Sequence, residues 1–229
     1  RCEMKTRSLY RRKLANSLVS SISGACALIG IVALVWIIYE VLLRGTGAIN
    51  WPFFTELPTP PGVPGGGLAN AMVGTLSITL LATLIGVPIG LFAGIYLAEF
   101  SDKSVFALSV KFTTNVLMGM PSIIIGLFVY TLLVVSTGHF SGYAGAVSLA
   151  IIMLPVVART TEDMLGLVPN ALREAALALG APRWKVTLGI VFRSAKSGLL
   201  TGVLLAIARV SGETAPLLFT ALNSPFWTL

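Results

Sequence analysis

The sequence predicts an all-α polytopic membrane protein, and three observations support this fold class. Only 11% of the residues are charged and 55% are hydrophobic, whereas a soluble domain usually carries about 25% charged residues. Uncharged runs longer than the roughly 20 residues that cross a bilayer recur along the chain. The basic residues gather in alternate connecting segments. Lipid is therefore the expected solvent for most of the chain.

The first two predicted spans lie on either side of a segment rich in proline and glycine. Leu14 to Tyr39 is 26 residues long and contains no charge, which is enough to cross a bilayer. Residues 57–67 contain mostly proline and glycine, so this segment is not expected to be helical. The second span therefore runs from about Ala69 to Ala98.

Three more spans are predicted in the second half of the chain. Phe112 to Ala158 is uncharged for 47 residues, which is too long for one helix. The turn-forming residues 137–142 divide this stretch into spans at about 120–136 and 143–158. A fifth span is expected at about 198–221. Five spans are thus visible in the sequence.

The distribution of basic residues predicts the orientation. If five spans alternate, residues 1–13, 103–111 and 159–196 lie on one side, and they hold 14 of the 16 basic residues. Cytoplasmic segments carry this excess of lysine and arginine. We therefore expect a multi-pass protein of the bacterial cytoplasmic (inner) membrane with a cytoplasmic N-terminus. The same distribution argues against nucleic-acid binding as the reason for the net charge of +7.

Several chemical functions have no motif in the sequence. There is no G-x-x-x-x-G-K-[ST] segment, so ATP binding by a P-loop is excluded. The two cysteines, Cys2 and Cys26, have no metal-ligand spacing, and His139 is a lone histidine in a predicted outer turn. Paired carboxylates that would indicate an enzyme are also missing. We expect no metal site and no catalytic residue.

The segment 168–192 predicts two short helices that face the cytoplasm. Apolar residues recur at helical spacing up to Leu179. Gly180 is expected to end the first helix, Pro182 prevents its continuation, and a second helix begins near Arg183. The small alanines of the first helix favour docking in a groove of a partner protein. The alternative is an ordinary amphipathic cytoplasmic loop.

At this point the sequence resembles a known family. Glu174-Ala175-Ala176, followed by Gly180 and by Ile190 ten residues later, is similar to the EAA loop of binding-protein-dependent ABC importer permeases. The family consensus continues with Leu-Pro, where this chain has Phe192-Arg193. Three further stretches resemble the PstA family of phosphate importer permeases, and they cover residues 118–126, 156–162 and 206–221.

The resemblance implies a MetI-like permease bundle that transports phosphate. It divides the chain into a cytoplasmic basic tail, residues 1–13, and a single permease domain, residues 14–229, with a cytoplasmic coupling loop at 159–196. Members of the family have six helices, so a sixth is expected to be missing at the C-terminus. The implied partners are a PstC-like permease, a PstB-like ATPase dimer and a PstS-like phosphate-binding protein. ATP and Mg²⁺ would bind the ATPase, so this chain would carry no cofactor.

Two charged residues inside the fifth predicted span are the strongest candidates for a substrate pathway. A charge at the centre of a span costs about 2.5–3.5 kcal/mol on insertion scales. Arg209 and Glu213 are four residues apart and are expected to share a helix face. A guanidinium fits phosphate oxygens, and a carboxylate accepts hydrogen bonds from a protonated phosphate. The alternative is a charge pair that only holds helices together.

The remaining site residues follow from the resemblance and from position in the sequence. Arg159 is either an exit-side phosphate contact or a positive-inside anchor, and Thr214 is a weaker hydroxyl candidate. The predicted ATPase-coupling residues are Glu174, Ala175, Ala176 and Gly180. The function alternatives are an ABC permease for another oxyanion, such as molybdate or sulfate, and a membrane sensor of phosphate.

Overall fold

The computed structural model describes residues 9–226 except 61, 64 and 101–103. The chain forms two compact units, one ending at Gly67 and one beginning at Leu68. Within the described residues, four helices are long and apolar enough to cross a membrane, and a bent helix pair adds a fifth crossing if it counts as one span. The all-α membrane class is confirmed. The single permease domain over residues 14–229 stays a prediction.

The first unit consists of one long helix and a short capped one. Helix α1, Leu9–Gly45, includes the first predicted span, and none of its described side chains is buried within the chain. A 3₁₀ turn, η1 (Thr46–Ala48), leads to α2, Trp51–Thr55, whose N-cap Asn50 accepts a hydrogen bond from the Phe53 amide. Most of the predicted basic tail, residues 1–8, lies outside the described residues.

The proline- and glycine-rich segment after α2 is not helical in its described part, as predicted. The Gly67 amide donates to the Leu57 carbonyl at 3.1 Å, and Thr59 Oγ1 donates to the Gly65 carbonyl at 2.8 Å. A Cβ on Gly67 would lie 2.4 Å from the Pro52 carbonyl oxygen, so only glycine fits there. The segment is therefore a loop closed by one backbone hydrogen bond and one from the Thr59 hydroxyl.

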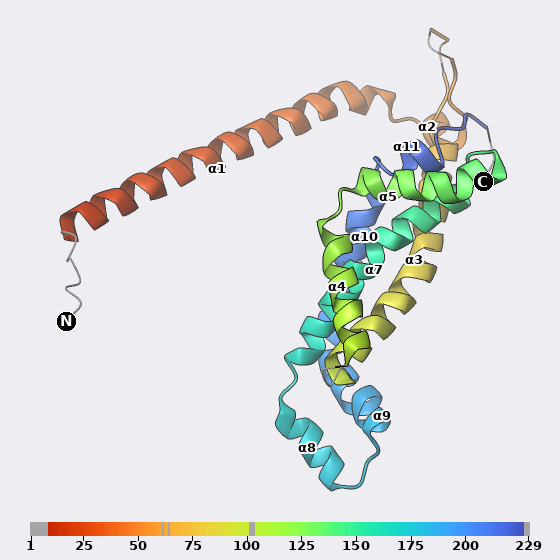
Figure 1. Cartoon of the computed structure of the whole chain (residues 1–229). Helices are drawn as coiled ribbons and strands as arrows, with labels where there is room; N and C mark the ends of the chain where they lie inside the picture. Colours follow the sequence, from red (N-terminus) through yellow and green to blue (C-terminus); the bar gives the residue numbers. More distant parts are fainter. Residues whose placement is uncertain (1–8, 61, 64, 101–103, 227–229) are drawn as a thin grey trace. The chain divides into compact units, whose positions relative to one another are not determined.

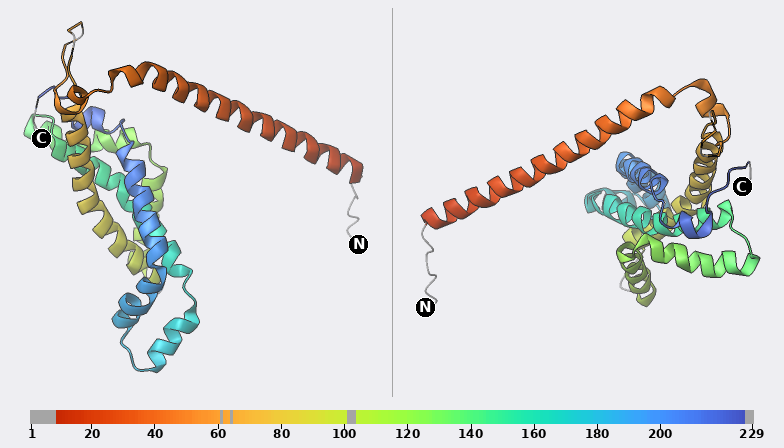
Figure 2. Two further views of the ribbon diagram at one scale, coloured as in Figure 1. Left: turned by 180° about the vertical axis from the view of Figure 1, so that it is seen from behind. Right: turned by 90° about the horizontal axis from the view of Figure 1, so that it is seen from above.

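Helices α3, Ala69–Glu99, and α7, Gly142–Gly166, form the centre of the second unit (Figures 1 and 2). Three glycines of α3, spaced four residues apart, face α7. A Cβ added at Gly86, Gly90 or Gly94 would lie 3.1, 2.8 or 2.5 Å from α7 atoms. Small residues at this spacing let membrane helices approach closely. We call this contact of Gly86, Gly90 and Gly94 with α7 the glycine seam.

The third predicted span, at about 120–136, agrees within two residues with the helical stretch from Ser122 to Thr137. The sequence does not predict the helix and the bend before it. A separate helix, α4 (Val105–Gly119), precedes it, and the chain then bends by 106° before α5 begins. Pro121 has no amide hydrogen and forces Met120 out of the helical region, with ψ of 134°. The span continues as α5, a π-helical segment and α6: Ser122–Val129, η2 Tyr130–Val134 and Val135–Thr137.

The turn predicted at residues 137–142 is confirmed. Gly138 has a φ of +75°, and Ser141 caps α7 by accepting a hydrogen bond from the Ala144 amide. The predicted end of the fourth span at Ala158 is too early, because α7 continues to Gly166. Arg159 therefore lies on a helix and not in a loop.

The fifth predicted span is also wrong in its bounds. One continuous helical stretch runs from Arg183 to Ser211, as α9 (Arg183–Val186), π-helical η3 (Thr187–Val191) and α10 (Phe192–Ser211). The last turn tightens at this end, and Pro216 cannot supply an amide to a continuing helix. The Gly212 and Glu213 amides donate to carbonyls only three residues back. A short helix, α11 (Leu217–Thr220), follows the break.

Candidate substrate pathway and coupling site

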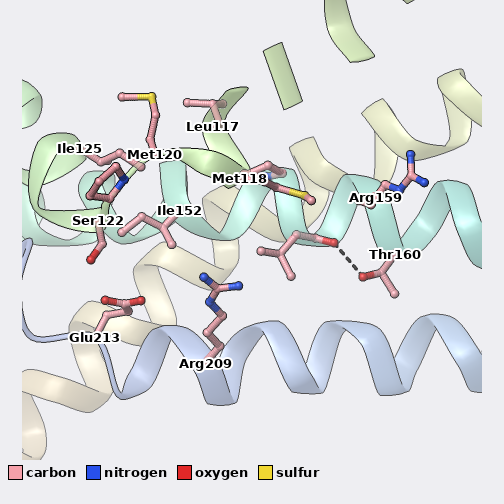
Figure 3. Close-up of a pocket in the computed structure, with 13 residues that line it drawn as sticks. Leu117, Met118, Met120, Ser122, Ile125, Ile152, Arg159, Thr160, Arg209 and Glu213 are labelled. Carbon is pink, nitrogen blue, oxygen red and sulfur yellow. Dashed lines mark hydrogen bonds between the residues drawn. The ribbon is translucent and has the colours of Figure 1, made fainter. Parts of the chain in front are cut away.

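A cavity of about 420 Å³ lies where the bend between α4 and α5 meets α7 and the end of α10. Its wall is mostly apolar, with two arginines, one carboxylate and two hydroxyls (Figure 3). The lining residues are Leu117, Met118, Met120, Pro121, Ser122, Ile125, Ile152, Pro155, Val156, Arg159, Thr160, Arg209 and Glu213. Small-ligand sites are typically apolar cavities with a few placed polar groups.

Arg209 and Glu213 both line this cavity, but they do not share a helix face as predicted. Arg209 lies in the last turn of α10, and Glu213 follows the end of the helix in the break before α11. Among the described residues, neither side chain has a hydrogen bond or an ion pair within 4.0 Å. Figure 3 shows both extending from the α10 end toward α7 and Ser122. The break therefore keeps the two charges on one cavity while leaving both available to a ligand.

Arg159 lines the same cavity but is already paired. Its guanidinium lies 3.3 Å from Glu162 and 3.2 Å from Asp163, and Lys111 of α4 binds Glu162 at 2.8 Å. In Figure 3, Arg159 lies on α7 to the right of Arg209, and its side chain points away from α10. The sequence offers two roles for Arg159, a ligand contact or an anchor. The structure adds a third role, because Arg159 and Lys111 share the Glu162 carboxylate and so link α7 to α4.

Three hydroxyl side chains in this region differ in position. Thr160 lines the cavity, donates from Oγ1 to the Val156 carbonyl at 2.8 Å and packs against Gly202, where a Cβ would lie 2.2 Å from Thr160 Cγ2. Thr214 is exposed and is not among the cavity residues. Ser122 was not predicted, although it follows a proline and begins helix α5. A proline after a long apolar helix is the signal that could have indicated this bend.

The coupling segment forms the two helices that the sequence predicts. Helix α8, Asn170–Ala178, ends in a left-handed Gly180 with φ of +79°. The Ala181 amide donates to the Ala176 carbonyl and the Gly180 amide to the Leu177 carbonyl, which is the Schellman pattern. A side chain at Gly180 would meet no neighbour but would strain the backbone.

The predicted coupling residues do not all face the same way. Ala176 is buried in a small core with Leu165, Val186 and Val191, so it cannot present its side chain to a partner. Glu174 and Ala175 are exposed, and Leu179 is 89% exposed beside the turn. In Figure 1, α8 and α9 lie together at one end of the second unit, away from α5 and α11.

Nothing in the described part of the chain resembles a catalytic or metal site. No group of three or more His, Cys, Asp or Glu side chains is positioned to hold a metal there. The His139 Nδ1 atom lies 3.0 Å from the Thr137 carbonyl oxygen in an exposed turn. The cavity can hold a small anion among a guanidinium, a carboxylate and a hydroxyl, but it offers no activated nucleophile.

Comparisons with known proteins identify the family of the chain. The family model described as binding-protein-dependent transport system inner membrane component matches residues 86–229. The phosphate transport system permease protein PstA of Yersinia pestis is 48% identical over 217 residues, which are 95% of this chain and 74% of the relative. The corresponding values for PstA of Haemophilus influenzae are 52%, 95% and 77%. PstA 1 of Mycobacterium tuberculosis is 39% identical over 91% of this chain and 69% of its own length.

A solved structure gives the same fold. A chain of the MetNI methionine ABC transporter in an inward-facing conformation matches with a TM-score of 0.61 and 23% sequence identity. The match covers 68% of this chain and 75% of that chain. At this identity the likeness concerns the fold alone, and it supports the MetI-like bundle.

Proposed function

Because the chain belongs to the family of the phosphate transport system permease protein PstA, we propose that it is the permease subunit of an ATP-driven importer of inorganic phosphate. It is a transport subunit and not an enzyme. The observation that carries the proposal is the position of Arg209 and Glu213, two charged and unpaired side chains on one cavity of about 420 Å³. A cavity of this kind suits a small charged substrate that must both enter and leave.

The charges at the cavity favour an oxyanion that still carries a proton. A guanidinium presents a planar fork of donors to phosphate oxygens, and the Glu213 carboxylate can accept a hydrogen bond from a protonated phosphate. Helix α5 begins at Ser122 on the cavity wall, and the N-terminus of a helix favours anions. Sulfate and molybdate lack a proton at neutral pH and would meet an uncompensated Glu213. Together with the PstA relatives, this chemistry favours phosphate.

The other parts of the transporter are proposed on the family resemblance. A PstC-like permease would complete the path, and a PstS-like protein would deliver phosphate at the outer side. A PstB-like ATPase dimer would bind ATP and Mg²⁺ and would contact α8, through the exposed Glu174 and Ala175 and the turn at Gly180. The chain would hold no cofactor of its own. The protein is a multi-pass membrane protein, and its cytoplasmic N-terminus remains part of the proposal.

The test is the Arg209→Gln variant in the assembled transporter. Losing a charge-assisted hydrogen bond of about 1.5–3 kcal/mol predicts a fall in phosphate uptake of about 10- to 150-fold. Arg193→Gln is the matched control, because Arg193 lies on the same helix, is exposed and does not line the cavity. Radiolabelled phosphate uptake is measured beside complex assembly and ATP hydrolysis. Normal uptake by an assembled Arg209→Gln complex would remove this cavity from the pathway, and a membrane sensor would then be the better explanation.

A further inference from the structure

Arg173, on the coupling helix α8, makes more polar contacts than any other side chain in the described part of the chain. Its Nη2 and Nε atoms lie 2.6 and 3.1 Å from Glu99 Oε1, at the C-terminal end of α3. It also donates to the carbonyls of Leu165 at 2.8 Å and Val168 at 2.5 Å, and to Asn170 Oδ1 at 3.1 Å. The Glu99 side chain is 8% exposed and that of Arg173 is 18% exposed. This ion pair is the most buried one among the described residues.

These contacts join three helices at a single guanidinium. Leu165 lies in the last turn of α7, where its carbonyl also accepts from the Val168 amide at 3.2 Å, and Val168 lies just beyond the helix. Arg173 supplies donors to both of them and pairs at the same time with the last residue of α3. Helices α3 and α7 are the two helices of the glycine seam. Arg173 therefore ties α8 to the end of the most closely packed helix pair in the unit.

The described residues at this junction combine polar and apolar contacts. A cavity of about 190 Å³ lies between the end of α3, α8 and the start of α9, with Glu99 and Arg173 on its wall. On the other side, α8 is held by Ala176, the residue of this helix buried in the local core. Leu165 of α7 belongs to this core, and Ile95 and Ala98 of α3 pack against it. The Arg173–Glu99 pair adds the direct polar link between α8 and the end of α3.

We propose that Arg173 is a positioning residue that transmits movement of the coupling helix to the α3–α7 pair through Glu99. This proposal rests on the proposed function, because α8 must contact an ATPase for the movement to arise. Lysine could not replace Arg173, since a single ammonium cannot reach a carboxylate and two carbonyls in this fork geometry. Without the pair, α8 would still meet its partner, but less of its displacement would reach α7, the helix of the α3–α7 pair that lines the cavity with Arg209 and Glu213.

The first measurement is the number of phosphate ions transported per ATP hydrolysed in proteoliposomes of the whole transporter. Arg173→Met is expected to lower this ratio at least fivefold while the ATPase subunit stays bound. Glu99→Gln should lower it less, because the carbonyl bonds of Arg173 remain. The double variant should be no worse than Arg173→Met alone, as expected for residues that act through each other. Arg193→Met, an exposed arginine of α10, is the control and should leave the ratio unchanged.

The second measurement does not depend on the substrate. Hydrogen exchange of the amides at residues 170–178 should increase in Arg173→Met, while exchange along α3 stays as in the wild type. If the wild-type complex moves no phosphate, the proposed function fails, and hydrogen exchange still decides whether Arg173 fixes α8. Unchanged exchange in α8 would overturn the inference. An unchanged transport ratio would also overturn it, and so would loss of the ATPase subunit from both single variants. If Arg173→Met does not assemble, the transport ratio and the hydrogen exchange are both measured on Glu99→Gln.

Discussion

The glycine seam and the cavity at the end of α10 both involve helix α7, but the first is closely packed and the second is open and charged. At the seam, Gly90 and Gly94 leave no room for even one added carbon, and the contact consists of backbone and small side chains. At the cavity, Arg209 and Glu213 keep charged side chains without partners, in about 420 Å³ of open volume. One face of α7 is therefore specified by shape, and another by charge. Changes at the first should damage folding, and changes at the second should damage transport.

The largest effect is expected from Gly94→Leu. A Cβ there would lie 2.5 Å from the Ala158 carbonyl oxygen and 2.5 Å from Thr161 Cβ, so the helices must separate. Overpacking of this kind costs about 1–3 kcal/mol or more, and we expect a large loss of folded protein. Thermal unfolding in detergent and the yield of assembled complex measure it. Gly74→Leu on the same helix is the control, because a Cβ at Gly74 meets nothing within 4 Å. Equal stability of both variants would show that the seam is not closely packed.

A moderate effect is expected from Lys111→Met, which tests the charged edge of the cavity. Lys111 is 47% exposed and its pair with Glu162 links α4 to α7. Exposed ion pairs are worth about 0–1 kcal/mol, so phosphate uptake should change by no more than about fivefold, with thermal stability nearly unchanged. The difference from wild type should shrink at high salt, because salt screens exposed charges. A loss of uptake as deep as that of Arg209→Gln would place Lys111 in the pathway itself.

The smallest effect is expected from Thr214→Val. Thr214 is exposed and does not line the cavity, and valine has nearly the same shape as threonine. Uptake and stability should both match the wild type. A clear fall in phosphate uptake by Thr214→Val would show that Thr214 contacts the substrate. It would also mean that the cavity extends beyond the break after α10 in the working transporter.

The sequence predicts the spans better than their interruptions. Composition indicates the apolar stretches within α1, α3 and α7, because lipid imposes a strong constraint on length and charge. It does not indicate that α10 ends at Ser211, since glycine and proline are tolerated in membrane helices when neighbours satisfy the backbone. From its charge, Lys111 is predicted to lie in a connecting segment on the inner side. In the structure Lys111 belongs to helix α4 and pairs with Glu162.

In the candidate site, too, the charged residues could be predicted from the sequence and the residues placed by a bend could not. Arg209, Glu213 and Arg159 could be predicted because charges are rare in apolar spans, and the structure brings all three to one cavity. Ser122 could not, because its place on the cavity depends on the 106° bend. The Arg173–Glu99 pair is separated by 74 residues, and neither the spacing nor the composition of the chain indicates which carboxylate meets which arginine.

The glycine seam also sets a condition on biosynthesis. Helix α3 ends at Glu99, while its partner α7 is complete only at Gly166. At about 5–20 residues per second, the glycine face of α3 waits roughly 3 to 13 s after leaving the ribosome before α7 exists. During that interval α3 must remain in the bilayer without α7 against its glycines. The apolar residues on its other faces therefore have to hold α3 in the membrane before its permanent neighbour is made.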